Sequence, residues 1–346
     1  MPNPRLTDIP KSNSRIKAAL CGNEAWQIER VFGRGRRERL ASLTELMPGH
    51  FSLADFPARA GELQDVEVLF STWGMDEPLA LAVRELPKLK AFFYAAGTVQ
   101  HFARPLLEKQ IVVVSAWAAN AVPVSQFTLS QILLSLKGYF RNVRETRMPA
   151  NRGRTVDPEA AGIFGTTVAL LGCGMVGRAV AGWLRPFGLE VLAYDPFLTE
   201  ADAEALAVRK VSLETAFASA QVISNHLADL PATRGLLGRK LFASMLPGAT
   251  FINTGRGATV VETELAEILA LRPDLTALLD VTFPEPPAAD SPLYGLENAH
   301  LSSHIAGSQG GEVVRMADYC LEEFQAWSRN LPLRFQVTPE RLENMA

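Results

Sequence analysis

Three side chains suited to carboxylate binding and proton transfer follow separate apolar segments in the second half of the chain. Arg256 follows TFIN in the segment Asn253–Gly257, Glu285 lies in LLDVTFPEPP, and His304 follows HLSS. A planar guanidinium can hold a carboxylate through two hydrogen bonds and can polarise a carbonyl. Histidine exchanges a proton near neutral pH, and a carboxylate partner would orient its ring. Together the three predict proton transfer at a small acid.

A glycine-rich turn precedes these residues and predicts a dinucleotide cofactor. Gly172-Cys-Gly174-Met175-Val176-Gly177 follows the apolar segment TTVALL and begins a helical segment. In such a turn the glycines allow a tight bend and close approach of a pyrophosphate, which the N–H groups at the helix start can bind. Asp195 stands 18 residues after Gly177. Its carboxylate can accept the ribose hydroxyls and repels a 2′-phosphate, so the turn predicts NAD rather than NADP.

The elements that must position these residues alternate between strand and helix, which predicts parallel sheets covered by helices. We predict strands at 16–21, 66–71, 89–95, 111–115, 166–171, 189–194, 221–224, 250–253, 275–281 and 300–303, and helices at 78–86, 122–147, 175–184, 261–271 and 311–329. A polar, Arg- and Pro-rich stretch at 142–158 predicts a surface excursion. A length of 346 residues predicts two domains. In open parallel sheets the chemistry gathers at the carboxyl edge.

Composition argues against several other classes of protein. The net charge of −3 shows no basic face for nucleic acid, and no apolar stretch is long enough to span a membrane. The Pro-rich start has no apolar core typical of a signal peptide, and three scattered cysteines predict reduced thiols, so we expect a cytoplasmic protein. The sequence contains no Cys/His cluster and no HExxH motif, so we expect no metal site. The segment Ala306–Gly310 lacks the first glycine of a hydrolase nucleophile turn.

These motifs, in this order, resemble those of the D-isomer-specific 2-hydroxyacid dehydrogenases over about residues 65–310. The resemblance is carried by LKAFFYAAGTV, NAVPVSQFTLSQILLSL, VALLGCGMVGRAVA, FINTGRG, LLDVTFPEP and SSHIAG. It implies that Arg256 binds and polarises the substrate, that His304 is the acid/base, and that Glu285 tunes His304. Formate dehydrogenases of the same broad family carry an amide instead of this acid. An acid at position 285 therefore favours a substrate whose oxygen gains a proton.

The resemblance also implies a fold and further contacts. The fold would be α/β, with two doubly wound parallel-sheet domains and the active-site cleft between them. A Rossmann-type NAD-binding domain would span 119–307, and a discontinuous flavodoxin-like substrate domain would span 1–118 and 308–346. Main-chain N–H groups at Gly97 and Thr98 would hold the substrate carboxylate, and Trp73 is a candidate for the pocket wall. A homodimer is implied. The expected cofactor contacts are Gly172, Gly174, Met175, Val176, Gly177, Asp195, Pro231, Thr233, Thr254, Gly255, Arg256, Asp280, His304 and Gly307.

Some alternatives stay open at this stage. Corepressors similar to the family keep the same catalytic residues and sense NADH, and phosphite oxidation is a third reaction to consider. The substrate, the physiological direction and the roles of Asn225 and His226 do not follow from the sequence, although His226 is most simply a loop histidine near the adenosine.

Overall fold

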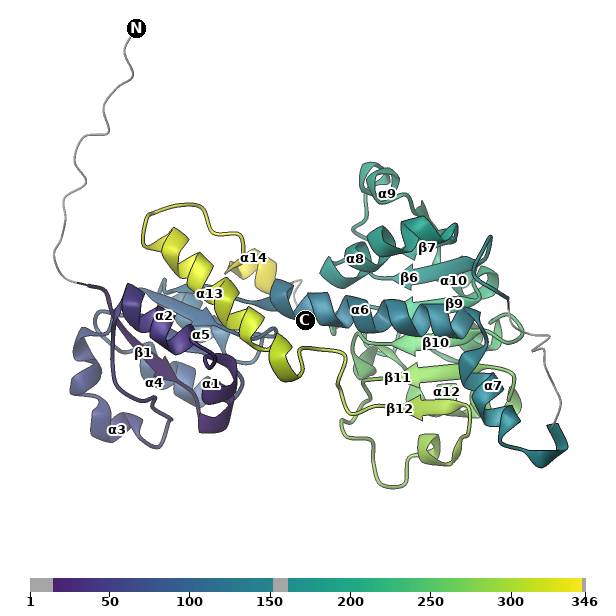
Figure 1. Ribbon diagram of the computed structural model, residues 1–346, viewed down its shortest axis with the longest axis horizontal. Coiled ribbons are helices and arrows are strands. Elements are labelled where there is room, and N and C mark those ends of the chain that lie inside the picture. Colours follow the sequence, from purple (N-terminus) through teal and green to yellow (C-terminus); the bar gives the residue numbers. More distant parts are fainter. Residues whose placement is uncertain (1–14, 152–160, 344–346) are drawn as a thin grey trace, which may run out of the picture. The chain divides into compact units, whose positions relative to one another are not determined.

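The chain folds into two compact units, each built around its own sheet. The computed structural model describes residues 15–151 and 161–343. One unit comprises the chain up to Trp117 together with Val313–Glu343, and the other comprises Ala118–Glu312 (Figure 1). The first unit is therefore discontinuous in sequence. The Pro-rich start of the chain and part of the predicted surface excursion, at 152–158, lie outside the described residues.

The first unit contains a six-stranded sheet in the order β13-β5-β4-β3-β1-β2. Strands β1 to β5 pair in parallel, and β13 pairs antiparallel with β5. Without β13 the order is that of a flavodoxin-like doubly wound sheet. The strands are Lys17–Cys21 (β1), Glu45–Leu46 (β2), Val68–Ser71 (β3), Ala91–Tyr94 (β4), Val112–Ser115 (β5) and Gln336–Val337 (β13); the helices are Ala25–Val31 (α1), Arg36–Leu43 (α2), Phe56–Arg59 (α3), Glu77–Val83 (α4), Ala103–Glu108 (α5), Val314–Trp327 (α13) and Pro339–Leu342 (α14), with a 3-10 helix at Glu62–Asp65.

Helix α13 returns to this unit because its apolar face completes an aromatic core. The ring of Phe324 contacts Phe70 of β3 and Phe93 of β4, with centroids 5.5 and 5.8 Å apart. On its other side, Asp318 accepts two hydrogen bonds from Arg36 of α2, at 3.0 and 2.6 Å. Each fully buried large apolar side chain contributes roughly 1.5–3 kcal/mol. The aromatic contacts therefore explain why α13 packs here.

The second unit contains a seven-stranded, fully parallel sheet in the order β12-β11-β10-β9-β6-β7-β8. Counted from β6, this is the Rossmann order with one additional strand at the edge. The strands are Thr167–Leu171 (β6), Glu190–Tyr194 (β7), Arg209–Lys210 (β8), Val222–Asn225 (β9), Thr250–Asn253 (β10), Thr276–Leu279 (β11) and Ala299–Leu301 (β12); the helices are Trp117–Leu136 (α6), Tyr139–Thr146 (α7), Met175–Leu184 (α8), Glu200–Leu206 (α9), Leu213–Ser219 (α10), Arg239–Ala243 (α11) and Glu262–Leu271 (α12), with 3-10 helices at Pro149–Asn151, Arg185–Phe187, Gly257–Thr259, Pro292–Gly295 and Gly310–Glu312.

Both faces of this sheet are buried because its strands carry apolar side chains at successive positions, and successive side chains point to opposite faces. In β6, Ala169 and Leu171 face one core, which also contains side chains of α10, α11 and α12. Val168 and Leu170 face a second core, which also contains side chains of α6 and α8. Helices therefore cover both faces, and the polar side chains that could bind a ligand lie at the strand ends.

The predicted long helix over 122–147 is wrong in one respect, since it is two helices. Helix α6 ends at Leu136 and α7 begins at Tyr139. Between them Gly138 adopts a left-handed conformation with φ of 65°. Glycine takes this conformation without steric cost, so the chain can change direction here. The helical spacing of the apolar residues continues across the break and conceals it.

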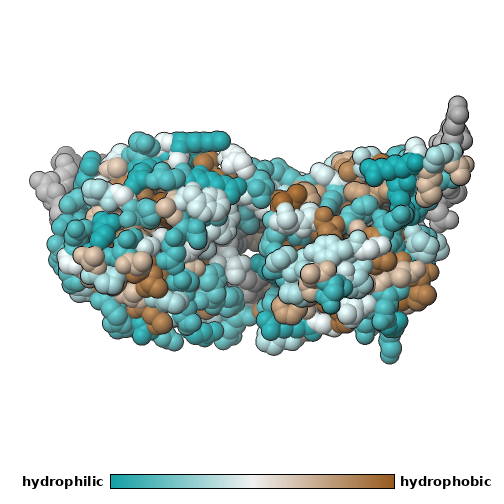
Figure 2. Space-filling view, turned by 90° about the horizontal axis from the view of Figure 1, so that it is seen from below, coloured by the Kyte–Doolittle hydropathy of each residue, from teal (hydrophilic) through white to brown (hydrophobic). Residues whose placement is uncertain are grey.

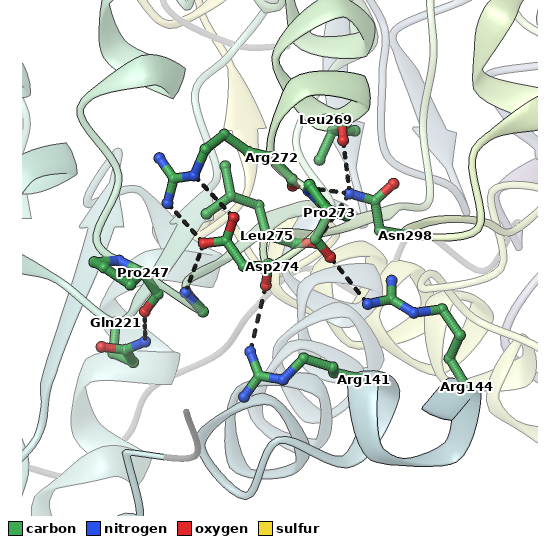
Figure 3. Close-up of polar contacts among 11 residues, drawn as sticks. Arg141, Arg144, Gln221, Pro247, Leu269, Arg272, Pro273, Asp274, Leu275 and Asn298 are labelled. Carbon is green, nitrogen blue, oxygen red and sulfur yellow. Dashed lines mark hydrogen bonds and ion pairs between the residues drawn. The ribbon is translucent and has the colours of Figure 1, made fainter. Parts of the chain in front are cut away.

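A polar network ties α7 to the amino ends of the strands in this unit (Figure 3). Arg141 and Arg144 of α7 donate to the carbonyls of Asp274 and Pro273, at 3.3 and 2.9 Å. Arg272 binds the carboxylate of Asp274 through two nitrogens, at 2.8 and 2.7 Å. The side-chain amide of Asn298 donates to the carbonyls of Leu269, Arg272 and Leu275. These contacts hold the segments that lead into β11 and β12.

Within residues 15–151 and 161–343, no helix combines the length and the apolar character that crossing a bilayer requires. On the face drawn in Figure 2, hydrophobic residues lie in small groups among hydrophilic ones.

Candidate active site

The glycine turn after β6 is shaped by close backbone contacts. Gly172 has φ of +92°, and a Cβ there would lie 2.9 Å from the His226 carbonyl oxygen. A Cβ on Gly177 would lie 2.1 Å from the carbonyl oxygen of Gly172, so only glycine lets α8 pack this closely on the strand. A Cβ on Gly174 would meet nothing within 4 Å, and the start of α8 has no side-chain cap. The N–H groups of Met175 and Val176 thus begin an uncapped helix suited to a phosphate group.

Asp195 follows β7 and holds the glycine turn in place. Its Oδ2 accepts the N–H of Cys173 at 2.7 Å, and its Oδ1 accepts the N–H of Phe197 at 2.8 Å. A carboxylate has about four acceptor positions, so these two bonds leave capacity for ribose hydroxyls. Cys173 itself is buried, and burial, followed by the charge of Asp195, raises the pKa of its thiol to about 11. The residues of this turn therefore fit NAD, and Cys173 stays a neutral thiol.

Arg256 lies in a loop after β10 that two buried asparagines organise. The side-chain amide of Asn225, at the end of β9, donates to Asn253 Oδ1 at 3.0 Å and to Thr259 Oγ1 at 2.9 Å. Asn253 Oδ1 also accepts the N–H of Gly255 at 3.1 Å. A Cβ on Gly257 would lie 2.0 Å from the carbonyl carbon of Thr282. Gly257, next to Arg256, thus permits close approach to the loop after β11.

The guanidinium of Arg256 is electrostatically coupled to two acids. Burial lowers the pKa of Arg256, while the carboxylates of Glu285 and Asp229 act in the opposite direction. Its Nη1 also donates to the carbonyl of Gly255 at 2.8 Å. An arginine keeps its charge under such conditions. The site therefore holds a partly buried cation that is within electrostatic reach of Glu285.

Asp280, at the end of β11, holds the loop that carries His304. Its Oδ1 accepts the N–H of Ile305 at 2.9 Å and the hydroxyl of Ser302 at 2.6 Å, and its Oδ2 accepts the N–H of Ala306 at 2.9 Å. His304 adopts φ of 57°, and its N–H donates to the Asp280 carbonyl at 2.9 Å. A left-handed conformation costs a residue with a side chain about 1–2 kcal/mol. The hydrogen bonds to Asp280 hold His304 in this conformation.

Glu285 and His304 are brought together from two loops. The Nδ1 of His304 lies 2.6 Å from Oε1 of Glu285, and both side chains are about half exposed, at 48% and 42%. Because Nδ1 is bonded to Glu285, the other ring nitrogen, Nε2, is not used in this pair. The Glu285 loop is also held at Phe283, whose N–H donates to Glu262 Oε1 at 2.5 Å. The pair has the geometry of an oriented acid/base.

His226, whose role the sequence leaves open, bridges several parts of the site. Its Nε2 lies 3.0 Å from Ser224 Oγ and its Nδ1 lies 3.3 Å from Thr254 Oγ1. Thr254 in turn contacts Thr128 of α6 at 3.0 Å. Burial lowers the pKa of His226 to about 4. A neutral His226 therefore links the glycine turn, the Arg256 loop and α6, and Asn225 has the structural role described above.

The other residues expected at the cofactor lie in loops of the same unit. The hydroxyl of Thr233 closes the turn that contains Pro231, accepting the N–H of Leu230 at 2.9 Å. Gly307 lies against Asn120, whose Oδ1 accepts the N–H of Ser308 at 2.9 Å. Both segments follow strands of the sheet, as Asp195 does.

The expected substrate residues of the first unit lie at the carboxyl edge of its sheet. Trp73 follows β3, and its ring lies under the guanidinium of Arg30, 5.9 Å from the ring centroid. Gly97 and Thr98 follow the adjacent strand β4, where Ser115 Oγ donates to the carbonyl of Gly97 at 2.5 Å. These three residues are therefore neighbours within one unit.

Several residues that support the site were missed by the sequence reasoning. Asn253, Ser302, Thr259 and Thr128 position the loops without being predicted. Asn225 and Asn253 had a usable signal, because each is a polar residue at the end of an apolar strand. Among the described residues, no group of three or more His, Cys, Asp or Glu side chains could hold a metal ion.

A family model matches residues 130–306, about half of the chain. Its description is the NAD binding domain of the D-isomer specific 2-hydroxyacid dehydrogenases. The match contains the glycine turn, Asp195, Arg256, Glu285 and His304. The prediction of NAD as the cofactor is thereby confirmed.

Individual relatives and structures agree with this match. A D-3-phosphoglycerate dehydrogenase of Archaeoglobus fulgidus is 30% identical over 238 residues, which are 68% of this chain and 44% of the relative. The chain thus matches less than half of that protein's length. The fold of this chain is similar to that of D-mandelate dehydrogenase from Rhodotorula graminis, with a TM-score of 0.76 and 20% identity. The similarity covers 94% of this chain and 98% of that one. For D-lactate dehydrogenase with NAD⁺ from Lactobacillus jensenii the TM-score is 0.72, with 20% identity and coverage of 93% and 99%.

Proposed function

Because the chain belongs to the D-isomer-specific 2-hydroxyacid dehydrogenases, we propose that it interconverts a small 2-oxo acid and the D-2-hydroxy acid at the expense of NADH or NAD⁺. The overall reduction consumes one 2-oxo acid, one NADH and one proton. In this proposal the unit Ala118–Glu312 binds the cofactor and the other unit supplies substrate contacts through Gly97, Thr98 and Trp73. When bound, NADH supplies the hydride that reaches C2.

Arg256 acts as the substrate anchor. Its guanidinium is partly buried and keeps its charge, so it can hold the carboxylate of the 2-oxo acid and polarise the C2 carbonyl. Polarisation places positive charge where the carbonyl oxygen becomes negative. The asparagine network beneath the loop holds the backbone at Gly255 and Arg256.

His304 acts as the acid and base. In the reducing direction its Nε2–H donates the proton to the developing alkoxide, and in the oxidising direction Nε2 removes the proton from the hydroxyl. Glu285, bonded to Nδ1 at 2.6 Å, sets the tautomer and stabilises the positive charge of the ring. Asp280 acts indirectly, since its carboxylate holds the backbone on the C-terminal side of His304.

The single observation that carries the proposal is the His304–Glu285 pair, next to Arg256, in the same unit as the glycine turn. A direct test follows NADH absorbance with the purified chain and a set of 2-oxo acids that includes glyoxylate, pyruvate and hydroxypyruvate. We expect turnover with at least one of them, and much lower rates with NADPH because Asp195 repels a 2′-phosphate. Phosphite with NAD⁺ serves as an additional substrate.

Two outcomes would contradict the proposal. Absence of turnover with every 2-oxo acid, although NADH binds, would favour an NADH-sensing protein, and NADH-dependent binding of a partner would then support that function. Turnover with phosphite alone would assign a different reaction.

We also propose that the protein is a homodimer and that it is located in the cytoplasm. Sedimentation of the purified chain tests the oligomeric state.

A further inference from the structure

A pocket of about 470 Å³ lies beside the His304–Glu285 pair, at the carboxyl end of the edge strand β12. Its apolar wall consists of Pro286, Pro287, Tyr294 and Leu301. All of its lining residues come from the unit Ala118–Glu312. An apolar cavity of about 150 Å³ can already hold benzene. The pocket is therefore large enough for a branched or aromatic group.

Most of the polar side chains in the lining already have hydrogen-bond partners within the protein. Asp280 accepts three hydrogen bonds from the His304 loop, one of them from Ser302. Glu285 is bonded to His304, and the hydroxyl of Thr282 donates to the carbonyl of Pro284 at 2.9 Å. The surface that remains for a ligand is mainly the apolar wall.

The charge of the lining disfavours a second anionic group. Two carboxylates line the pocket, those of Asp280 and Glu285, and none of its lining residues is a lysine or an arginine. An ionised carboxylate or phosphate placed here would lose its hydration and face charges of the same sign. An apolar group would lose nothing by leaving water.

We propose that this pocket receives the C3 substituent of the 2-oxo acid, and that this substituent is uncharged, apolar and bulky. The inference rests on the proposed function, in which the carbonyl oxygen is bound at His304 and the carboxylate at Arg256. Arg256 does not line the pocket, so the third group on C2 is the one left to enter it. The preferred class is a branched aliphatic or phenyl-substituted 2-oxo acid. A phosphorylated one is disfavoured, although the A. fulgidus relative is a phosphoglycerate dehydrogenase.

Two nearly isosteric substrates test the inference. 4-Methyl-2-oxopentanoate and oxaloacetate differ mainly in carrying an isopropyl group or a carboxylate on C3. We expect kcat/KM to be at least about tenfold higher for 4-methyl-2-oxopentanoate, since one methylene in an apolar pocket changes kcat/KM by about 10–200-fold. Phenylpyruvate should also be reduced, and 3-phosphooxypyruvate should be reduced poorly. Glyoxylate has no C3 and reports on the catalytic residues alone.

Substitutions of Tyr294 connect the preference to the pocket. Tyr294→Ser should lower the ratio of kcat/KM for 4-methyl-2-oxopentanoate over glyoxylate by about tenfold. Tyr294→Arg should raise the ratio for oxaloacetate over 4-methyl-2-oxopentanoate. Tyr294 is 57% exposed, so neither change should unfold the protein. Tyr139→Ser, at a tyrosine of α7 that is 48% exposed, is the matched control and should leave both ratios unchanged.

The outcomes separate this inference from the proposed function. Reduction of glyoxylate without preference for the apolar substrate, or equal ratios in Tyr294→Ser and the parent protein, would overturn the inference and leave the proposed function intact. No reduction of any 2-oxo acid, glyoxylate included, would overturn both.

Discussion

The two ends of the strands in the unit Ala118–Glu312 carry similar side chains that are used differently. At the amino ends, Arg272, Asp274 and Asn298 bind one another or backbone carbonyls (Figure 3). At the carboxyl ends, Arg256 and the pair Glu285–His304 stand in loops, and the pair is about half exposed. The same chemical groups therefore stabilise one end of the sheet and remain available to a ligand at the other.

The difference shows that residue type alone does not distinguish the candidate active site from the other end of the sheet. What distinguishes the carboxyl end is an exposed side chain, that of His304, which keeps hydrogen-bonding capacity beyond its bond to Glu285. The amide of Asn298 is buried and directs its N–H groups to backbone carbonyls. His304 uses one ring nitrogen for Glu285 and holds a left-handed backbone conformation. If only the carboxyl end performs chemistry, backbone strain is expected there, as at His304, and hydrogen-bonded side chains are expected at the amino end, as at Asn298.

The largest expected effect is at His304. His304→Ala should lower kcat by about 10²–10⁴-fold, because the positioned proton donor is lost. Its exposed side chain contributes little to packing, so the urea midpoint should stay close to that of the parent protein. Steady-state kinetics, NADH binding by fluorescence and urea unfolding measure the three quantities. Full turnover in this variant would remove His304 from the mechanism.

The next largest effect is expected when the same substitution, arginine to lysine, is made at the carboxyl end and at the amino end of the sheet. Arg256→Lys should lower kcat/KM by about 10–100-fold, since an ammonium cannot make the two parallel hydrogen bonds to a carboxylate. Arg272→Lys, the matched control at the amino end, should leave kcat/KM within about twofold and cost under about 1 kcal/mol of stability. Kinetics with one 2-oxo acid tests both variants. Similar losses in both would show that the two ends do not differ as described.

A smaller effect, on stability alone, is expected at Asn298. Asn298→Ala should lower the free energy of unfolding by about 1–3 kcal/mol, because carbonyls of Leu269, Arg272 and Leu275 lose a buried donor. Turnover per folded molecule should not change. Urea unfolding and an activity assay on the same sample check this. A variant of unchanged stability would contradict the role of the amino-end network.

The smallest effect concerns the pH dependence at His226. Its folded pKa of about 4 lies below the unfolded value of about 6.5, so the unfolded chain binds the proton first as the pH falls. This contribution to stability is present above about pH 6.5 and is lost as the pH falls towards 4. Between pH 7 and 4.5, His226→Gln should lose roughly 2 kcal/mol less stability than the parent protein. Parallel urea titrations at the two pH values measure the difference, and equal losses would contradict it.

Much of the chemistry could be predicted because it depends on local spacing. The periods of the apolar residues predicted the strands and most of the helices that surround the glycine turn, and α8 and β10 begin and end where expected. The turn, Asp195 and the three polar segments each lie directly after a strand, and the parallel arrangement brings such ends to one edge. The sequence therefore determined the fold class, the cofactor and the candidate residues.

Contacts between residues far apart in the chain were decided by the tertiary structure alone. The bond of Asp280 to the His304 loop, the Asn225–Asn253 bridge and the pocket beside Tyr294 join segments that no local pattern connects. The return of α13 through the contact of Phe324 with Phe70 is of the same kind. The spacing of apolar residues shows which face of a helix or strand is buried. Which other element packs against that face depends on how the whole chain folds.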